Sequence, residues 1–205
     1  MAKFDVKKEG HYRAKLGVFD LIEIPEQTYL TIDGTGDPNT AREYQDAVSA
    51  LYPIAYGMKF ASKKDLDRDY VVPPLEGLWC ADDMESFTSR RSKDEWRWTM
   101  MIMTPHWITT DMFTQAQAKA MSKKDASPRI GDVRMVGLSQ GLVVQTLHIG
   151  PYDEEGPIIA AMHEHAYSQG LTLAGKHHEI YLGDPRRTAS EKLKTILRQP
   201  VKQPQ

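Results

Sequence analysis

A strand, a glycine-containing turn and an amphipathic helix follow one another twice in this chain of 205 residues. The first copy occupies residues 28–60 and the second occupies residues 142–169, and strand-forming sequence follows each helix. A repeated unit constrains the fold because both copies must bury equivalent faces. Helices and strands do not alternate evenly enough for a doubly wound parallel sheet. The pattern therefore predicts an α+β fold in which a strand–helix–strand–strand unit occurs twice.

The first copy is expected to begin with a half-buried strand at residues 28–33, where polar and apolar side chains alternate. Thr40 is followed three residues later by Glu43, a spacing typical of the capping box that starts a helix. Pro53 lies inside this helix and is expected to kink it, because proline removes a backbone donor. We expect further strands at residues 17–25, 70–80, 95–103, 141–150, 175–182 and 194–201, helices at 109–123 and 151–169, and polar loops at 62–69 and 82–94. A second match to the capping-box spacing means that a helix remains the alternative to a strand for the segment 194–201.

The composition is that of an ordinary globular protein, with 26% charged and 40% hydrophobic residues. A formal net charge of -2 gives no electrostatic reason to expect nucleic acid or an anionic membrane as a partner. Cys80 is the only cysteine, so no disulfide can form within the chain. The N-terminus is polar, and no apolar run approaches the ~20 residues of a membrane-spanning helix. We therefore expect a cytoplasmic protein.

Two patterns that would indicate a catalytic serine or a metal site are not supported by the sequence around them. The sequence around Ser139 matches the G-x-S-x-G nucleophile elbow, but an alternating strand follows where the motif requires a helix. Its glycines are interpreted as the ends of a hairpin turn. His163 and His165 are two residues apart on a predicted helix and face different ways. His177 and His178 are adjacent on a predicted strand and point to opposite faces, so we expect no metal site and no cofactor.

One predicted strand carries the most suggestive side chains. Alternation places His177, Glu179 and Tyr181 on one face, and the residues between them on the opposite face, which is expected to pack on helices. A buried carboxylate without a partner is costly. A cationic ligand would be such a partner, and aromatic faces would add cation–π attraction. The alternatives are that Glu179 pairs with Arg186 or Arg187, or that it faces solvent.

Aromatic residues on other segments are candidates for completing a cage around this carboxylate. They are Trp79, Trp96, Trp98 and Trp107 together with Tyr29 and Tyr152, and some of them must belong to the core. A tryptophan whose N–H has no partner is poorly suited to a sealed core. At least one of them is therefore expected in a partly open position.

The chain resembles the GyrI-like small-molecule-binding family, and in particular its stand-alone subgroup. The matching blocks are PEQTYLTIDGTGDPN (25–39), LYPIAYGMK (51–59), VVPPLEGLW (71–79), GLVVQTLHIGPYDEE (141–155), HHEIYLGDPRR (177–187) and EKLKTILRQPVK (191–202). They cover most of the chain in order, and together they are more specific than any one of them.

The resemblance implies one domain over residues 1–205, made of two pseudo-symmetric β-α-β-β (SHS2-like) repeats that form an antiparallel sheet with a ligand cleft between them. The repeats would span about 17–104 and about 133–202, joined by a helix at about 109–123. The resemblance also places Glu179 in the cleft, with Trp79 and Tyr152 as the best-matched partners. Trp98, Trp107, Tyr29 and Tyr181 are weaker extensions of the same site.

The resemblance leads to a first hypothesis, in which the cleft binds bulky aromatic, often cationic small molecules and so sequesters toxic compounds. The second is a hydrolase that opens the cyclopropane ring of DNA-alkylating compounds, with Glu179, Trp79 and Tyr152 as catalytic residues. A third, an inhibitor acting through protein contacts, would need an exposed apolar patch, and the sequence shows no such stripe. Nothing in the sequence bears on an interaction with gyrase, which some family members inhibit.

Overall fold

The computed structural model describes residues 3–80 and 96–204. In these residues the chain forms a nine-stranded antiparallel sheet with the order β1-β6-β9-β8-β3-β4-β2-β5, and β7 pairs with β9. The strands are β1 (Asp20–Ile24), β2 (Gln27–Thr35), β3 (Leu75–Cys80), β4 (Arg97–Thr104), β5 (Arg134–Leu138), β6 (Gly141–Ile149), β7 (Thr172–Leu173), β8 (His177–Tyr181) and β9 (Lys194–Lys202). The helices are α1 (Arg42–Asp65), α3 (Thr110–Met121) and α4 (Gly156–Ser168), with 3-10 turns η1 (Val6–Lys8), η2 (Gly10–Tyr12), η4 (Ile130–Asp132), η5 (Tyr152–Glu154) and η6 (Ser190–Lys192). The predicted α+β class with an antiparallel sheet is confirmed.

The strand order requires the sheet to curl. Only Ser139 and Gln140 join β5 to β6, yet β5 lies at one end of the sheet and β6 lies next to the other end. Pro25 and Glu26 join β1 to β2 in the same way. Linkers this short can connect the two ends only if the sheet curves round to bring them together. The hairpin expected around Ser139 is therefore wrong, because β5 pairs with β2 while β6 pairs with β1 and β9.

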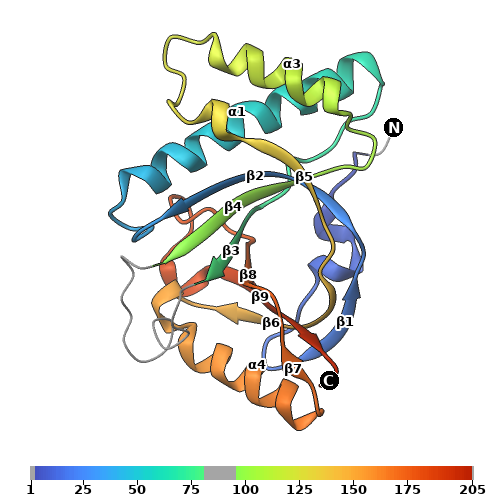
Figure 1. Ribbon diagram of the computed structural model, residues 1–205, viewed down its shortest axis with the longest axis vertical. Coiled ribbons are helices and arrows are strands. Elements are labelled where there is room, and N and C mark those ends of the chain that lie inside the picture. Colours follow the sequence, from blue (N-terminus) through green and yellow to red (C-terminus); the bar gives the residue numbers. More distant parts are fainter. Residues whose placement is uncertain (1–2, 81–95, 205) are drawn as a thin grey trace.

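The α-helices lie on one face of the sheet, with α1 against β2 and β4, α3 beside α1, and α4 against β6 and β9 (Figure 1). Leu51 and Ile54 of α1 share a large apolar core with Leu30 of β2. Met162 of α4 shares a smaller core with Leu197 of β9. Burial of these faces is the main driving force that fixes the helices on the sheet.

The opposite face of the sheet, inside the curl, is covered by the N-terminal turns. Val6 and Tyr12 from η1 and η2 pack there with Ile180 of β8. The expectation that the Ile180 face of β8 packs on helices is therefore wrong, since the α-helices lie on the Glu179 face. The reason is that alternation distinguishes the two faces of a strand but does not say what covers each one.

A buried polar network lies on this inner face. Glu76 of β3 accepts a hydrogen bond from the Tyr12 hydroxyl at 2.5 Å, and its other oxygen lies 2.8 Å from His178 Nε2. Glu76 and His178 are fully buried, and burial lowers the pKa of His178 from its ordinary value. Through these bonds the network joins the N-terminal turns to the centre of the sheet. Removing one partner would be costly, because it would leave the other buried and unpaired.

The start and the end of α1 differ from the prediction. The helix begins at Arg42 with Ala41 at the N-cap, so Thr40 and Glu43 do not form the expected capping box. Instead, the Asp37 carbonyl accepts the backbone N–H groups of Thr40 and Ala41. The helix also continues to Asp65, into the segment expected to be a loop, where Ser62 is buried and donates its hydroxyl to the Arg68 carbonyl at 2.7 Å. Pro53 lies inside α1, as the sequence indicates.

Most of the remaining elements follow the predicted segments with small differences at their ends, whereas the strands β5 and β7 were not predicted. β3 begins at Leu75, after two prolines that cannot donate to a ladder. The helix expected at 151–169 divides into η5 and α4, and Gly170 follows it with a φ of 72°. The last segment is the strand β9 and not a helix. The polar turn expected at 82–94 lies outside the described residues.

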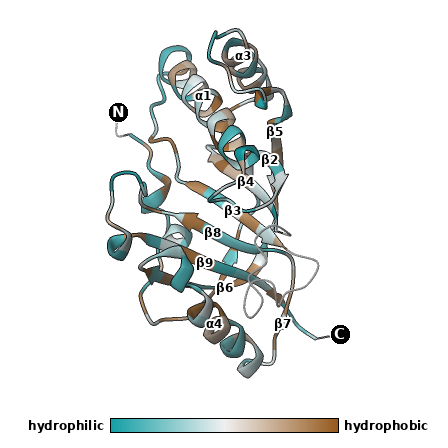
Figure 2. Ribbon diagram, turned by 90° about the vertical axis from the view of Figure 1, so that its left-hand side faces the viewer, coloured by the Kyte–Doolittle hydropathy of each residue, from teal (hydrophilic) through white to brown (hydrophobic). Residues whose placement is uncertain are grey.

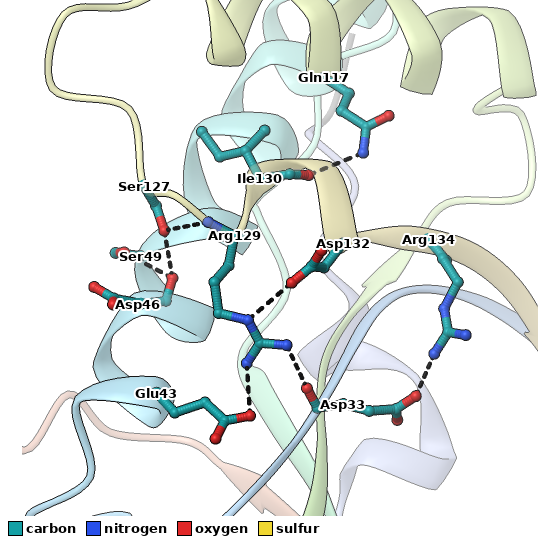
Figure 3. A network of polar contacts seen from close by, with 10 residues as sticks. All are labelled: Asp33, Glu43, Asp46, Ser49, Gln117, Ser127, Arg129, Ile130, Asp132 and Arg134. Carbon is teal, nitrogen blue, oxygen red and sulfur yellow. Dashed lines mark hydrogen bonds and ion pairs between the residues drawn. The ribbon is translucent and has the colours of Figure 1, made fainter.

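Arg129 connects the segment after α3 to the rest of the fold. Its guanidinium donates to the main-chain carbonyl of Asp33 at 2.8 Å, to Glu43 at 3.3 Å and to Asp132 at 2.9 Å (Figure 3). Arg134 pairs with the carboxylate of Asp33. Since Asp33 belongs to β2 and Glu43 to α1, these charge-assisted bonds fix the entry to β5 against the junction of β2 and α1.

Exposed aromatic side chains form a row along α1. Tyr52, Tyr56 and Phe60 follow at intervals of four residues, with ring centroids 6.5 Å and 6.3 Å apart. Tyr56 is 46% exposed and Phe60 is 61% exposed. This corrects the view that the sequence holds no apolar stripe, because helical spacing places these three side chains in a row.

No helix among the described residues is long and apolar enough to cross a membrane.

Gly34 provides a test of the packing between β2 and β4. It lies directly opposite Trp98, and a Cβ built on it would come within 2.1 Å of the Trp98 ring. Trp98 has no room to move, because it is buried and donates its Nε1–H to the Gly36 carbonyl at 3.2 Å. We expect Gly34→Ala to lower the free energy of unfolding by about 2 kcal/mol or more in denaturant titrations.

The matched control is Gly10→Ala, because a Cβ at that position meets no atom within 4 Å. Its free energy of unfolding is expected to stay within about 0.5 kcal/mol of the wild type. Equal stabilities of the two variants would contradict the packing of Trp98 on Gly34.

Candidate functional site

The side chains of β8 alternate as predicted, with His177, Glu179 and Tyr181 on one face. The Tyr181 hydroxyl donates to Glu179 Oε2 at 2.7 Å. His177 Nε2 lies 3.5 Å from Glu179 Oε1, and neither ring nitrogen makes a hydrogen bond of ordinary geometry. The Glu179 side chain is 14% exposed, so it does not simply face solvent. The carboxylate is thus oriented by residues of its own strand.

Two arginines were the alternative partners for Glu179. Arg186 instead donates twice to the carboxylate of Asp184, at 2.9 Å in each case, and Arg187 lies 3.9 Å from the same carboxylate. The side chains of both arginines are exposed. They therefore form a surface ion-pair group in the loop after β8.

A glycine on the neighbouring strand makes room for the next contact. Gly77 of β3 is directly opposite Glu179, and Trp79 donates its Nε1–H to the Tyr181 hydroxyl at 3.0 Å. A Cβ at position 77 would lie 2.7 Å from Trp79 Nε1 and 3.1 Å from the Tyr181 hydroxyl. The absence of a side chain at Gly77 therefore permits the chain of hydrogen bonds from Trp79 through Tyr181 to Glu179.

Two further tyrosines reach this point from helical segments. Tyr44 of α1 lies with its ring 6.5 Å from that of Trp79, at an interplanar angle of 25°. Tyr152 of η5 meets Tyr181 edge-on, with centroids 5.5 Å apart. Tyr152 is 37% exposed, so the group of rings reaches the surface there. Figure 2 shows why both can contribute, since β3 and β8 lie side by side between α1 and α4.

Glu155, the residue before α4, adds a second carboxyl group. It is 4% exposed, its Oε1 has no hydrogen-bond partner, and its side chain does not cap α4. Burial, and then the negative charge of Glu179, raise the pKa of Glu155 far above its ordinary value of 4.5, although the Thr195 hydroxyl lowers it in part. We call the residues around this point the Glu179 cluster: Tyr44, Trp79, Tyr152, Glu155, His177, Glu179 and Tyr181.

The tyrosines of the cluster keep their protons at neutral pH. Burial, followed by the charges of Glu155 and Glu179, raises the pKa of Tyr152 to about 12. Burial and the charge of Glu179 also raise the pKa values of Tyr44 and Tyr181. Their hydroxyl groups are therefore hydrogen-bond donors, and Tyr181 uses its own on Glu179.

Three predicted site residues have other surroundings. Trp98 is buried under α1 directly opposite Trp79, with Tyr44 edge-on to it, so it adjoins the cluster one strand further from Glu179. Trp107 packs against Phe4 and donates its Nε1–H to Ser62 at 2.9 Å. Tyr29 is buried on the inner face of the sheet, where its hydroxyl donates to Gln27. The structure thus brings together Glu179, Tyr181, Trp79 and Tyr152, places Trp98 behind Trp79, and leaves Trp107 and Tyr29 apart.

Sequence reasoning missed three contributors to the cluster. Tyr44 was assigned to the buried face of the first helix, which is correct but incomplete. Gly77 and Glu155 were not singled out, although both lie in blocks that carried the family resemblance, PLEGLW and GPYDEE. In residues 3–80 and 96–204, no three His, Cys, Asp or Glu side chains gather as a metal site.

The fold and the comparisons define a small-molecule-binding domain. The family model for the GyrI-like small molecule binding domain matches residues 18–202, so the chain belongs to the GyrI-like family. This confirms the family that the sequence blocks indicate. No curated protein sequence matches the chain.

Solved structures agree with this assignment. An uncharacterized conserved protein from Listeria innocua is 39% identical, with 98% of this chain and 100% of that one covered and a TM-score of 0.88. A hydrolase from Listeria innocua is 38% identical over the same shares of the two chains, with a TM-score of 0.84. The EcmrR C-terminal domain shares the fold at 13% identity, covering 91% of this chain and 98% of that one, with a TM-score of 0.57.

Glu155 leads to a prediction about the pH dependence of stability. Because its pKa is higher in the folded state than its ordinary 4.5, the folded state binds this proton more tightly than the unfolded state. The resulting stabilisation is fully present below the unfolded pKa and is lost as the pH rises toward the folded pKa, by at most roughly 1.4 kcal/mol per pH unit. We expect Glu155→Gln to gain stability relative to the wild type between pH 5 and pH 8.

Urea unfolding at the two pH values measures this difference. The control is Glu154→Gln at the neighbouring exposed position, whose stability relative to the wild type is expected not to change with pH. A Glu155→Gln difference that stays constant from pH 5 to pH 8 would show that Glu155 is ionised in the folded protein.

Proposed function

We propose that the Glu179 cluster lines a cleft that binds bulky aromatic, often cationic small molecules. The observation that carries this proposal is the carboxylate of Glu179 among the rings of Trp79, Tyr181 and Tyr152, with no arginine or lysine paired to it among the described residues. A flat cation would supply the missing positive charge and would stack on the rings. Binding of this kind would sequester a toxic compound.

The solvent exposure of the rings indicates the order in which a ligand would meet them. Tyr152 reaches the surface and would meet the ligand first, whereas Trp79 is 4% exposed and forms the floor. Large aromatic faces contribute most of the apolar contact area. Glu179 lies between them, where low solvent exposure strengthens its attraction for a cation.

We also propose that the domain consists of two pseudo-symmetric repeats. Apart from the two-residue strand β7, the series β2-α1-β3-β4 and β6-α4-β8-β9 have the same element order, and β3 pairs with β8 at the middle of the sheet. Outward from this pair, the strands read β4-β2-β5 on one side and β9-β6-β1 on the other. This order supports two pseudo-symmetric repeats in one domain, with the cleft on the pseudo-two-fold axis between them.

Binding of rhodamine 6G, followed by fluorescence anisotropy, tests the proposal. We expect the wild type to bind this flat cation and Glu179→Gln to bind it at least about tenfold more weakly, because the counter-charge is lost while the shape is kept. Glu164→Gln, on the exposed side of α4, is the matched control and is expected to bind like the wild type. Equal affinity of Glu179→Gln and the wild type for rhodamine 6G would show that Glu179 does not take part in binding.

A second candidate function is hydrolysis in the same cleft. The observation that favours it is the 38% identity to a Listeria innocua protein named as a hydrolase, over 98% of this chain. We propose for this case that the substrate is a cyclopropane-bearing DNA-alkylating compound. Glu179, Trp79 and Tyr152 would then be the catalytic residues.

The proposed reaction needs few groups because ring strain supplies much of the driving force. Glu179 would take a proton from a water molecule, whose oxygen forms a bond to the strained ring carbon. The ring C–C bond breaks, and its electron pair moves through the conjugated system to a carbonyl oxygen, which becomes a phenol after taking up a proton. Trp79 and Tyr152 would hold the substrate in line for attack.

Hydrolysis of a cyclopropane-fused cyclohexadienone, followed by the loss of dienone absorbance, tests this second function. We expect Glu179→Gln to lower the single-turnover rate by about 100-fold or more, because a glutamine cannot accept the proton. The rate for Glu164→Gln is expected to match the wild type. Wild-type binding of rhodamine 6G without turnover of the dienone would leave the binding function and exclude this reaction.

A further inference from the structure

Buried polar atoms without a hydrogen-bond partner gather between α4 and the sheet. They are Glu155 Oε1, Thr195 Oγ1, His163 Nε2, Gln199 Oε1, Thr146 Oγ1 and both ring nitrogens of His177. Across residues 3–80 and 96–204, only Thr31 Oγ1 and Arg198 Nη1 are in the same state elsewhere. Buried polar groups in folded proteins are nearly always paired, so a polar group of a ligand that reached this layer would find hydrogen-bond partners in it.

Glu155 and Thr195 are the members of the layer that border the Glu179 cluster. Thr195 of β9 is directly opposite Tyr181 of β8, so both side chains lie on the same face of the sheet. The charge of Glu179 acts on Glu155, and the charge of Glu155 acts on Tyr152. His163 of α4 has His177 and Gln199 as its neighbours.

The two carboxyl groups of the cluster offer different hydrogen-bonding capacities. Glu179 already accepts the Tyr181 hydroxyl bond at 2.7 Å, as a carboxylate does. Glu155 is 4% exposed, bonds neither its own helix nor Thr195 with ordinary geometry, and lies near a like charge. Burial and like charge both favour the neutral acid, which has one O–H to donate. The Thr195 hydroxyl can donate as well.

We propose that Glu155 and Thr195 form a polar subsite of the cleft that binds a carbonyl or phenol oxygen of the ligand through their O–H groups. This inference rests on the proposed small-molecule function and narrows the ligand to an aromatic ring system that carries a hydrogen-bond-accepting oxygen. Glu179 takes the cationic or reacting part of such a molecule. A ligand with both groups is then oriented in the cleft, because each carboxyl group recognises a different end.

Two fluorescent probes of similar size test the subsite, namely acridone, a neutral ring ketone, and acridine orange, a cation without a carbonyl group. We expect the wild type to bind both. Glu155→Ala is expected to weaken the binding of acridone about tenfold more than it weakens the binding of acridine orange, because it removes a neutral donor and no charge. Glu155→Gln keeps an N–H donor and is expected to restore most of the acridone affinity.

Glu154→Ala, at the adjacent exposed position, is the matched control and is expected to change neither affinity. The infrared carbonyl band of bound acridone gives a second readout that a purely structural role would not move. It is expected at lower frequency in the wild type than in Glu155→Ala. Thermal denaturation of each variant confirms that it is folded before binding is compared.

The outcomes separate this subsite from the function on which it rests. Failure of the wild type to bind either probe overturns the proposed cleft itself, and the subsite with it. Binding of acridine orange but not acridone, or an equal loss of both probes in Glu155→Ala, overturns the subsite and leaves the cation-binding function in place. A selective loss of acridone that Glu155→Gln reverses supports the subsite.

Discussion

The antiparallel pairing of β3 with β8 is the contact on which the site and the sheet both depend, because it joins the two groups of strands at the centre. On its inner face it carries the fully buried pair of Glu76 and His178. On its outer face Gly77 lies opposite Glu179. A slip of one residue would exchange the two faces, so the buried pair also fixes the side on which Glu179 lies. Structural and candidate functional residues are therefore set by one register.

The outer face of this pairing carries the Glu179 carboxylate, and its surroundings depend on a missing side chain as well as on the side chains present. Gly77 has no side chain, which admits the indole of Trp79 and the hydroxyl of Tyr181 over the strand. The aromatic rings exclude water, which raises the cost of an unbalanced charge. Glu155 lies near enough to Glu179 that burial and repulsion favour one neutral and one charged group. A ligand that is cationic at one end and accepts a hydrogen bond at the other suits both.

Local patterns predicted the elements more reliably than their ends or their surroundings. Alternation located β2, β6 and β8, and helical spacing located α1, α3 and α4. The capping signal at Thr40 failed because the Asp37 carbonyl binds the N–H groups just before the helix and moves its start to Arg42. The hairpin expected at Ser139 failed because β5 pairs with β2, whereas β6 pairs with β1 and β9 near the other end of the strand order. Both failures are cases of tertiary context overriding a sound local signal.

The sequence by itself determined that His177, Glu179 and Tyr181 share a face, because the two-residue period of a strand is a local property. It also determined the family, through blocks that cover most of the chain. Only the tertiary structure decided which distant residues join them. Trp79 is 102 residues from Tyr181 and reaches it through the pairing of β3 with β8, whereas Trp107 and Tyr29 are directed into other contacts. Such neighbours depend on strand order and on the curl of the sheet, which no local period encodes.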